Sequence, residues 1–172
     1  MIKIGEVLFD EQTIQKRVKE LAETISNDYD DLVVVIVLNG AMFFAVDLMR
    51  SLSIPVSITT LSLGSYGQTG TKSGVVRLNN DIQVDIEGRN VLLVEDIIDT
   101  GKTMRYLQAL FQFRNPASIR LCSFLSKPSR REIKIDIDYL GFEVHDYFVI
   151  GYGLDYREQF RALPYIAIAD IS

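Results

Sequence analysis

The chain has 172 residues, a formal net charge of −5 and an apolar fraction of 48%, which suits one domain over residues 1–172 with a sizeable core. The acidic balance and the absence of a dense lysine–arginine run argue against a nucleic-acid or membrane partner. The apolar runs are too short to span a bilayer and the N-terminus has no signal-peptide pattern, so we expect a cytoplasmic protein.

The first part of the chain predicts two helices around a buried strand. Asp10 is a typical N-cap for a helix that ends near Ser26. The apolar face of this helix consists of Ile14, Val18, Leu21 and Ile25. The β-branched run Leu32–Leu38 lacks polar alternation, which is typical of a central strand buried on both faces. Asn39-Gly40 ends that strand, and we expect a second helix over Ala41–Leu52.

A polar segment divides the next pair of strands. An extended run follows Pro55 and leads into Gly64–Gly74, which is rich in glycine, serine and threonine. Because this segment has almost no apolar side chains to pack, we expect a mobile surface loop there. Val75–Leu78 is the expected return strand.

The second half of the chain continues the alternation of strand and helix. We expect a buried strand over Asn90–Asp96, a helix over Gly101–Phe113 and a strand over Ser118–Leu125 that buries Cys122. Three short strands are expected around Tyr139–Phe142, Phe148–Ile150 and Tyr165–Ala169. This order predicts an α/β fold with a central, mainly parallel sheet flanked by helices, and ligands beyond the carboxyl ends of its strands.

The segment VLLVEDIIDTGKTM, Val91–Met104, is the most informative part of the chain. It runs from a buried strand through a short turn into a helix, whose unpaired N–H groups and dipole form an anion site. Gly101 permits close approach of the backbone to a phosphate, and the hydroxyls of Thr100 and Thr103 are further donors. The turn therefore predicts a phosphate site.

Two acids in the same segment require a different partner. Glu95 and Asp96 would repel a phosphate, but carboxylates suit sugar hydroxyls and a magnesium ion, which prefers oxygen ligands. The segment therefore favours a ligand with a phosphate at one end and vicinal hydroxyls nearby, which is the shape of a ribose 5-phosphate. The acidic net charge then indicates a need for Mg2+.

Two other interpretations of the segment are weaker. The GKT sequence could end a nucleotide-triphosphate P-loop, but that motif needs a glycine five positions before Gly101, where this chain has Asp96. An ordinary strand–loop–helix with one capping Asp or Thr explains one polar residue. It does not explain an acidic pair followed by DTGKT.

The sequence VEDIIDTGKT resembles the phosphoribosyl-pyrophosphate signature of type I phosphoribosyltransferases, and more narrowly that of the hypoxanthine-guanine phosphoribosyltransferases. Further matches follow in the right order over nearly the whole chain: LNG at Leu38–Gly40 resembles the family's pyrophosphate loop, and Ser65-Tyr66 the start of its catalytic lid. Lys127 and the segment Phe148–Arg161 resemble its base-reading and metal-binding parts. The resemblance implies the type I phosphoribosyltransferase fold, with a small hood subdomain.

The resemblance implies a division of labour within the central segment. Asp99 would accept the proton that a purine loses at N7 while its N9 bonds to the sugar, although Asp99 could also simply cap the helix. Glu95 and Asp96 would face the ribose hydroxyls, directly or through Mg2+. The phosphoribosyl site would also include Thr100, Gly101, Lys102 and Thr103.

The pyrophosphate site implied by the resemblance consists of Leu38, Asn39, Gly40 and Arg161. The family often has a cis peptide in this loop, which would fall between Leu38 and Asn39, but the sequence alone does not decide whether this bond is cis. Asn39 occupies the position of a common lysine or arginine, so only its backbone role carries over. Asn39-Gly40 is also compatible with a plain turn, and Arg161 with a structural ion pair.

The purine site implied by the resemblance lies downstream. Lys127 would donate to O6 of the base, Phe148 would stack on its ring and the backbone of Val149 would read its edge. Asp155 would adjoin the base and help to hold a second Mg2+. The alternatives are a surface lysine, a core phenylalanine and a turn acid. Tyr147 stands where the family often has lysine.

The resemblance implies purine salvage: transfer of a 5-phosphoribosyl group from 5-phospho-α-D-ribose 1-diphosphate to hypoxanthine or guanine, giving IMP or GMP and pyrophosphate. A lid over Gly64–Gly74, with Ser65 and Tyr66 in the catalytic machinery, would exclude water. The family implies a homodimer or homotetramer. The rivals are a phosphoribosyltransferase for xanthine or a pyrimidine, and a nucleic-acid-binding regulator of the same fold, which would need a basic face.

Overall fold

The computed structural model describes residues 2–65 and 76–171 and shows an α/β architecture. In chain order its elements are β1 (Ile2–Phe9), α1 (Glu11–Asp28), β2 (Leu32–Leu38), α2 (Met42–Ser51), β3 (Val56–Ser65), β4 (Val76–Asn80), β5 (Asn90–Ile98), α3 (Lys102–Gln112), β6 (Ser118–Ser126), the 3-10 turn η1 (Pro128–Arg130), β7 (Tyr139–Glu143), β8 (Val149–Ile150) and β9 (Ile166–Ile171).

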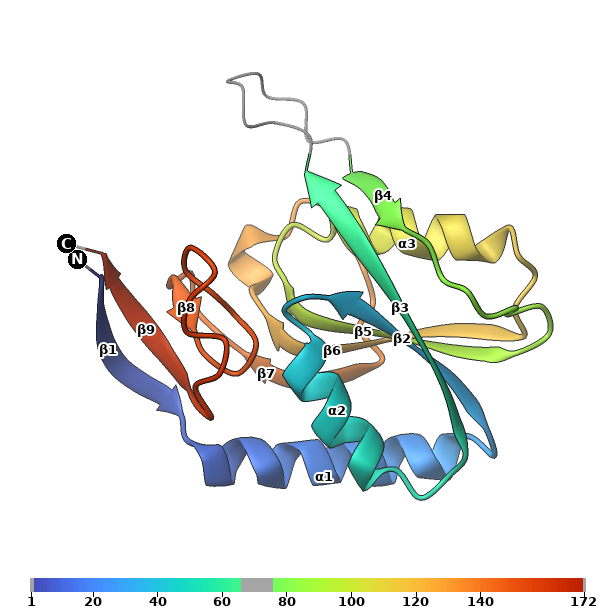
Figure 1. Cartoon of the computed structure of the whole chain (residues 1–172), viewed down its shortest axis with the longest axis horizontal. Helices are drawn as coiled ribbons and strands as arrows, with labels where there is room; N and C mark the ends of the chain where they lie inside the picture. The colour runs from blue at the N-terminus through green and yellow to red at the C-terminus, as the bar shows by residue number, and fades with distance from the viewer. Residues whose placement is uncertain (1, 66–75, 172) are drawn as a thin grey trace.

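The main sheet has six strands in the order β4-β3-β2-β5-β6-β7. All neighbouring pairs are parallel except β3 and β4, which are antiparallel. Helices α1 and α2 cover one face of this sheet, and α3 covers the other (Figure 1). The predicted mainly parallel sheet with helices on both faces is therefore confirmed.

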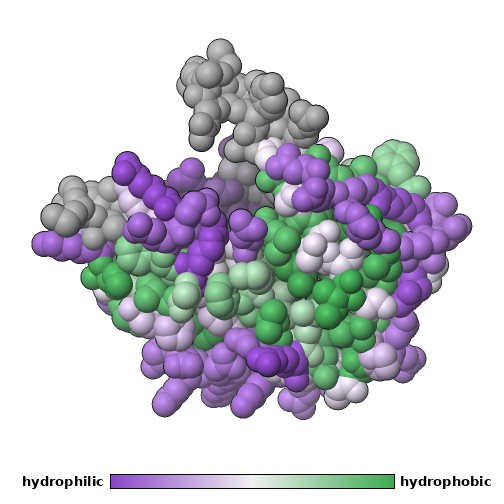
Figure 2. Space-filling view, viewed as in Figure 1, coloured by the Kyte–Doolittle hydropathy of each residue, from purple (hydrophilic) through white to green (hydrophobic). Residues whose placement is uncertain are grey.

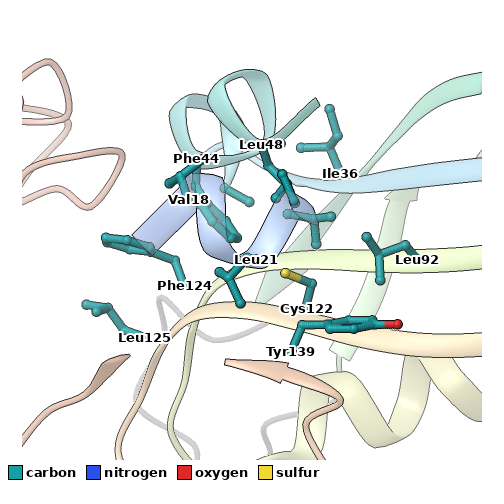
Figure 3. Close-up of a cluster of buried hydrophobic side chains, with 14 of the residues drawn as sticks. Val18, Leu21, Ile36, Phe44, Leu48, Leu92, Cys122, Phe124, Leu125 and Tyr139 are labelled. Carbon is teal, nitrogen blue, oxygen red and sulfur yellow. The ribbon is translucent and has the colours of Figure 1, made fainter. Parts of the chain in front are cut away.

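Two hydrophobic clusters explain why the central strand β2 lacks polar alternation. Val33 and Val35 belong to the cluster under α3, whereas Val34 and Ile36 belong to the cluster under α1 and α2. Both faces of the strand are thus buried, as predicted. In the second cluster, side chains from α1 and α2 surround the buried thiol of Cys122 (Figure 3).

A second, three-stranded sheet has the order β1-β9-β8 and is antiparallel. It brings the N-terminal and C-terminal strands side by side (Figure 1). The sequence pattern did not predict β1, because Ile4 and Val7 remain 44% and 47% exposed and produce no clear apolar face. This sheet is the small unit expected beside the main one.

The boundaries of the expected elements hold to within a few residues. The Asp10 side chain accepts a hydrogen bond from the Thr13 N–H at 2.8 Å, which makes it the N-cap of α1. Strand β5 extends two residues beyond the expected end, to Ile98. Gly64 and Ser65 belong to β3 rather than to a loop, and the rest of the expected lid, including Tyr66, lies outside the described residues. Among the described residues, no helix is long and apolar enough to cross a membrane.

Candidate active site

The turn between β5 and α3 lies at the carboxyl end of a central strand, as expected for a ligand site in this fold. Gly101 is the N-cap of α3 and has a φ of +83°, which favours glycine. The carbonyl oxygen of Thr100 accepts hydrogen bonds from the N–H groups of Glu132 and Ile133, both at 3.1 Å. These two hydrogen bonds hold the turn against the segment that follows η1.

A cavity of about 220 Å³ opens in front of this turn. Its lining comes from the end of β5, the turn itself and the start of α3: Glu95, Ile97, Ile98, Asp99, Thr100, Gly101, Thr103 and Met104. The volume is below that of a pocket for a whole drug-sized ligand, so it suits one part of a larger substrate. The structure thus brings together most of the residues that the sequence assigned to a phosphoribosyl group.

Glu95 and Asp96 form a buried acidic pair at the end of β5. Glu95 is 8% exposed, and its Oε1 accepts a hydrogen bond from the Asp96 N–H at 3.1 Å. Burial and the neighbouring Asp96 carboxylate raise the pKa of Glu95 well above its ordinary value. Burial also raises the pKa of Asp96. Burial and mutual repulsion therefore make the charged forms of the pair less favourable, and a bound cation would offset this.

Asp99 lines the cavity with a half-exposed carboxylate and is not the N-cap of α3. Its carboxylate accepts a hydrogen bond from the Thr100 N–H, but the N-cap residue of the helix is Gly101. The second oxygen of Asp99 lies 3.9 Å from Nε of Arg130. Simple helix capping therefore does not account for Asp99, and its half-exposed carboxylate remains accessible to a bound molecule.

Lys102 occupies a different position from its neighbours. Its ammonium group forms an ion pair with Glu132, and the residue is not part of the cavity lining. Its N–H points at the hydroxyl of Thr100 at 3.4 Å. The side chain of Lys102 is thus directed to Glu132 and not into the cavity.

The loop after β2 contacts the acidic pair directly. The peptide between Leu38 and Asn39 is cis, at the bond where the resemblance places the family's cis peptide. A Cβ atom on Gly40 would lie 1.5 Å from Oδ2 of Asp96, so a larger residue fits there only if the Asp96 carboxylate moves. A Cβ atom on Gly153 would lie 1.9 Å from the carbonyl oxygen of Gly40. Three segments that are distant in the sequence therefore meet at Gly40.

Arg161 and Asp155 form an ion pair within the segment after β8. Nη2 of Arg161 lies 2.7 Å from Asp155 and 3.3 Å from Glu158, and its Nη1 donates to the carbonyl oxygen of Gly153 at 2.8 Å. The structural ion pair weighed in the sequence is thus present. The same contacts place the guanidinium beside Gly153, next to the Gly40 loop.

The side chains assigned to a purine gather at the ends of β6 and β8. The Lys127 ammonium donates to the carbonyl oxygen of Tyr147 at 2.6 Å and is only 12% exposed, so it is not a solvated surface lysine. Phe148 is 47% exposed, and its ring meets Tyr156 edge-to-face with centroids 5.8 Å apart. Phe148 is therefore not a core residue, and its ring is available for stacking.

An ion-pair chain that the sequence did not predict joins the two parts of the site. Asp146 lies 3.7 Å from Nζ of Lys127 and 3.3 Å from Nη1 of Arg130, and Arg130 in turn approaches Asp99. The pair of arginines in KPSRR is the sequence feature that could have indicated this chain of ion pairs. Arg131, its second member, donates to the Ser126 hydroxyl at 2.7 Å.

The acidic residues fit magnesium only in combination with a substrate. Among the described residues, no three potential ligands cluster closely enough to hold a metal ion alone. Mg2+ typically retains waters and binds through one or two carboxylates plus substrate phosphates. Glu95 and Asp96 provide such a pair of oxygen donors, whereas Asp155 is already paired with Arg161.

Comparisons with known proteins are consistent across nearly the whole chain. A family profile described as "Phosphoribosyl transferase domain" matches residues 6–157. The hypoxanthine-guanine phosphoribosyltransferase of Mycobacterium tuberculosis is 42% identical over 175 residues, covering 97% of this chain and 87% of the relative. The enzyme of the same name from Bacillus subtilis is 42% identical over 167 residues, covering 96% and 93%.

A solved structure agrees with these relatives. The crystal structure of a hypoxanthine-guanine phosphoribosyltransferase from Bacillus anthracis superposes with a TM-score of 0.92 at 40% identity, covering 99% of this chain and 100% of that one. The similarity thus includes the main sheet, the small sheet and every segment that contributes to the cavity.

Proposed function

This chain belongs to the phosphoribosyltransferase family, and we propose that it is a purine salvage enzyme. It transfers the 5-phosphoribosyl group of 5-phospho-α-D-ribose 1-diphosphate to hypoxanthine or guanine, giving IMP or GMP and pyrophosphate. The observation that carries this proposal is the contact between the Gly40 loop and Asp96. This contact lies next to the turn before α3, which is held by hydrogen bonds from Glu132 and Ile133. It brings a candidate pyrophosphate site against a candidate ribose site.

The 5-phosphate is proposed to bind at the start of α3. Thr100, Gly101 and Thr103 line the cavity, and the N–H groups at the start of α3 together with the two threonine hydroxyls are the proposed donors. Lys102 contributes its N–H and not its side chain, which is paired with Glu132. The position of the phosphate fixes the ribose over Glu95 and Asp96.

The acidic pair is proposed to bind the ribose hydroxyls and Mg2+. Mg2+ held by these carboxylates together with the substrate would neutralise phosphate charge and favour departure of pyrophosphate. Glu95 and Asp96 lie where the ribose would be, so their carboxylates can stabilise the positive charge that develops when C1 loses pyrophosphate. Asp155 is proposed to help hold a second Mg2+, which requires Arg161 to share or release the Asp155 carboxylate.

Pyrophosphate is proposed to bind the backbone of Leu38, Asn39 and Gly40. Asn39 carries no charge, so Arg161 is the cation assigned to this group. Arg161 already lies beside Gly153, whose backbone touches Gly40. As the C1–oxygen bond breaks, its electron pair leaves with pyrophosphate.

The base is proposed to lie on Phe148, with its edge on the backbone of Val149 and its O6 on Lys127. The ammonium of Lys127 donates to an oxygen and not to an amino group, which favours a 6-oxopurine over adenine. N9 of the purine forms the new bond to C1, and the proton released by the base passes to Asp99 from N7. A general base of this kind typically contributes a factor of about 10²–10⁴ to the rate.

The lid and the assembly complete the proposal. Ser65 and Tyr66 remain candidates for a segment that shields the reaction from water. A homodimer or homotetramer is proposed because apolar side chains of α2 and β3 remain exposed: Met42, Val46 and Ile58. Figure 2 shows apolar surface across the middle of the face that contains these elements.

A panel of bases tests the proposed function. The protein is mixed with 5-phospho-α-D-ribose 1-diphosphate, Mg2+ and one base at a time: hypoxanthine, guanine, xanthine, adenine or uracil. We expect nucleotide from hypoxanthine and guanine and little from adenine. Preferred use of xanthine or uracil would replace the proposed specificity, and no turnover with any base would favour a regulator that retains the fold.

A further inference from the structure

The segment between β8 and Asp155 has an unusual backbone. Gly151, Tyr152 and Gly153 are consecutive and have φ values of +98°, +44° and +102°. Glycine adopts this region freely, but a bulky residue there is a true outlier and carries a conformational cost. Such cost persists only where the surroundings fix the residue, and it is concentrated at functional sites. The contacts of Tyr152 therefore need an explanation.

The Tyr152 side chain is held on both its apolar and its polar side. It is 5% exposed, and its ring lies 5.0 Å from that of Phe124, centroid to centroid. Its hydroxyl donates to Oδ2 of Asp47 at 2.7 Å, and Gln15 donates to the same oxygen at 2.9 Å. Burial, followed by the Asp47 carboxylate, raises the pKa of Tyr152, so the hydroxyl keeps its proton and remains a donor.

The hydrogen bond between Tyr152 and Asp47 completes a ring of contacts around the proposed pyrophosphate loop, Leu38–Gly40. Asp47 lies in α2, which begins at Met42, two residues after Gly40. Tyr152 directly precedes Gly153, whose backbone touches the carbonyl oxygen of Gly40. The Tyr152–Asp47 bond thus links the helix on one side of the loop to the segment on the other side.

We infer that Tyr152, through its hydrogen bond to Asp47, is a positioning residue that holds Gly153 against the pyrophosphate loop. The bond fixes the distance between the Gly40 loop and the segment that carries Asp155 and Arg161. Tyr152 itself touches no substrate. This inference rests on the proposed function, because it assigns the loop to pyrophosphate.

The substitution Tyr152→Phe removes only the hydroxyl and keeps the ring on Phe124. We expect the KM for 5-phospho-α-D-ribose 1-diphosphate to rise about 5- to 20-fold, because small misplacements of binding groups are costly. The KM for hypoxanthine should change less than about twofold. Phe148 is fixed by its carbonyl oxygen, which accepts from the Ala169 N–H at 2.8 Å, and Lys127 by the Tyr147 carbonyl.

A matched control exists at the opposite end of the sheet. The hydroxyl of Tyr139, the first residue of β7, donates to Oδ2 of Asp28 at 2.5 Å. Tyr139→Phe therefore removes a tyrosine–aspartate bond away from the carboxyl ends of the strands, together with the hydrogen bond that Arg120 donates to the same hydroxyl at 2.7 Å. Both variants should lose comparable thermal stability, but only Tyr152→Phe should raise the KM for the phosphoribosyl donor.

Substitutions of Asp47 provide a rescue test. Asp47→Asn retains an oxygen that accepts the Tyr152 hydroxyl and should stay within about twofold of the wild-type KM. Asp47→Leu removes the acceptor and should reproduce the Tyr152→Phe phenotype, with no further rise in the double variant.

The outcomes separate this inference from the proposed function. The wild-type protein is assayed first, and absence of nucleotide with every base would contradict the proposed function. With an active wild type, the inference is wrong if Tyr152→Phe and Tyr139→Phe raise the donor KM equally. It is also wrong if Tyr152→Phe raises the donor and base KM values by the same factor, or if Asp47→Asn behaves like Asp47→Leu.

Discussion

The buried acidic pair should lower the stability of the folded protein at high pH, although its carboxylates are the proposed ligands of ribose and Mg2+. The substitution Glu95→Gln tests this prediction. Glu95 is 8% exposed and adjoins the Asp96 carboxylate, and these surroundings raise its pKa. Between the ordinary carboxyl pKa of 4.5 and the raised value, the folded state binds more protons than the unfolded state. The free energy of unfolding therefore falls as the pH rises through this window.

The amide introduced by Glu95→Gln is always neutral. The variant therefore avoids the loss of stability that ionisation of the buried Glu95 causes in wild type at high pH. Each unit by which the pKa is raised corresponds to about 1.4 kcal/mol between the two protonation states. We expect a gain of about 1–3 kcal/mol for the substitution at pH 8, in the range of a buried polar group without full compensation. For a domain of this size, that gain corresponds to a rise in Tm of roughly 3–10 °C. Near pH 4.5, the two proteins should differ by less than about 0.5 kcal/mol.

Thermal unfolding followed by circular dichroism at pH 4.5, 6 and 8 measures this effect without ligand. Glu23→Gln is the control, because Glu23 is exposed on α1 and should give a small, pH-independent change. With Mg2+ and 5-phospho-α-D-ribose 1-diphosphate added, wild type should gain more in Tm than Glu95→Gln, since the variant has lost a ligand group. Destabilisation by Glu95→Gln at pH 8, or an equal shift at all three pH values, would refute the reasoning.

Three further substitutions test the other parts of the site. Asp99→Asn should lower kcat about 10²- to 10⁴-fold and leave the affinity for the phosphoribosyl donor within about threefold, as measured by steady-state kinetics and calorimetry. Lys127→Met should raise the KM for hypoxanthine by about 10- to 100-fold, with adenine affected least, which the base panel checks. Gly40→Ala should strongly weaken binding of pyrophosphate in calorimetry, because its Cβ would overlap the Asp96 carboxylate. Normal values in any of the three would remove that residue from the proposed site.

The part of the site that the sequence predicted is local. The strand, turn and helix around Thr100 are consecutive in the chain, so unpaired helix N–H groups and the strand-end acids follow from the pattern alone. Five of these residues, Glu95, Asp99, Thr100, Gly101 and Thr103, line one cavity, and their roles stay a prediction. Lys102 is the exception, because its partner Glu132 comes from a segment that no local pattern places there.

The part that the sequence did not predict depends on contacts between distant segments. The Tyr152–Asp47 bond and the chain from Lys127 through Asp146 to Arg130 join residues whose neighbours are set by the fold and not by spacing. Strand β1 was missed for a different reason. Its pairing with β9 relies on backbone hydrogen bonds, and its half-exposed side chains produce no apolar periodicity.

The most direct test of the central claim is product analysis with hypoxanthine as the base. Purified protein is incubated with hypoxanthine, 5-phospho-α-D-ribose 1-diphosphate and Mg2+, and IMP and pyrophosphate are quantified by mass spectrometry and a coupled assay. We predict equimolar IMP and pyrophosphate, with no product when the metal is chelated. Folded protein that forms no IMP, or that releases pyrophosphate with ribose 5-phosphate and no nucleotide, would contradict the account.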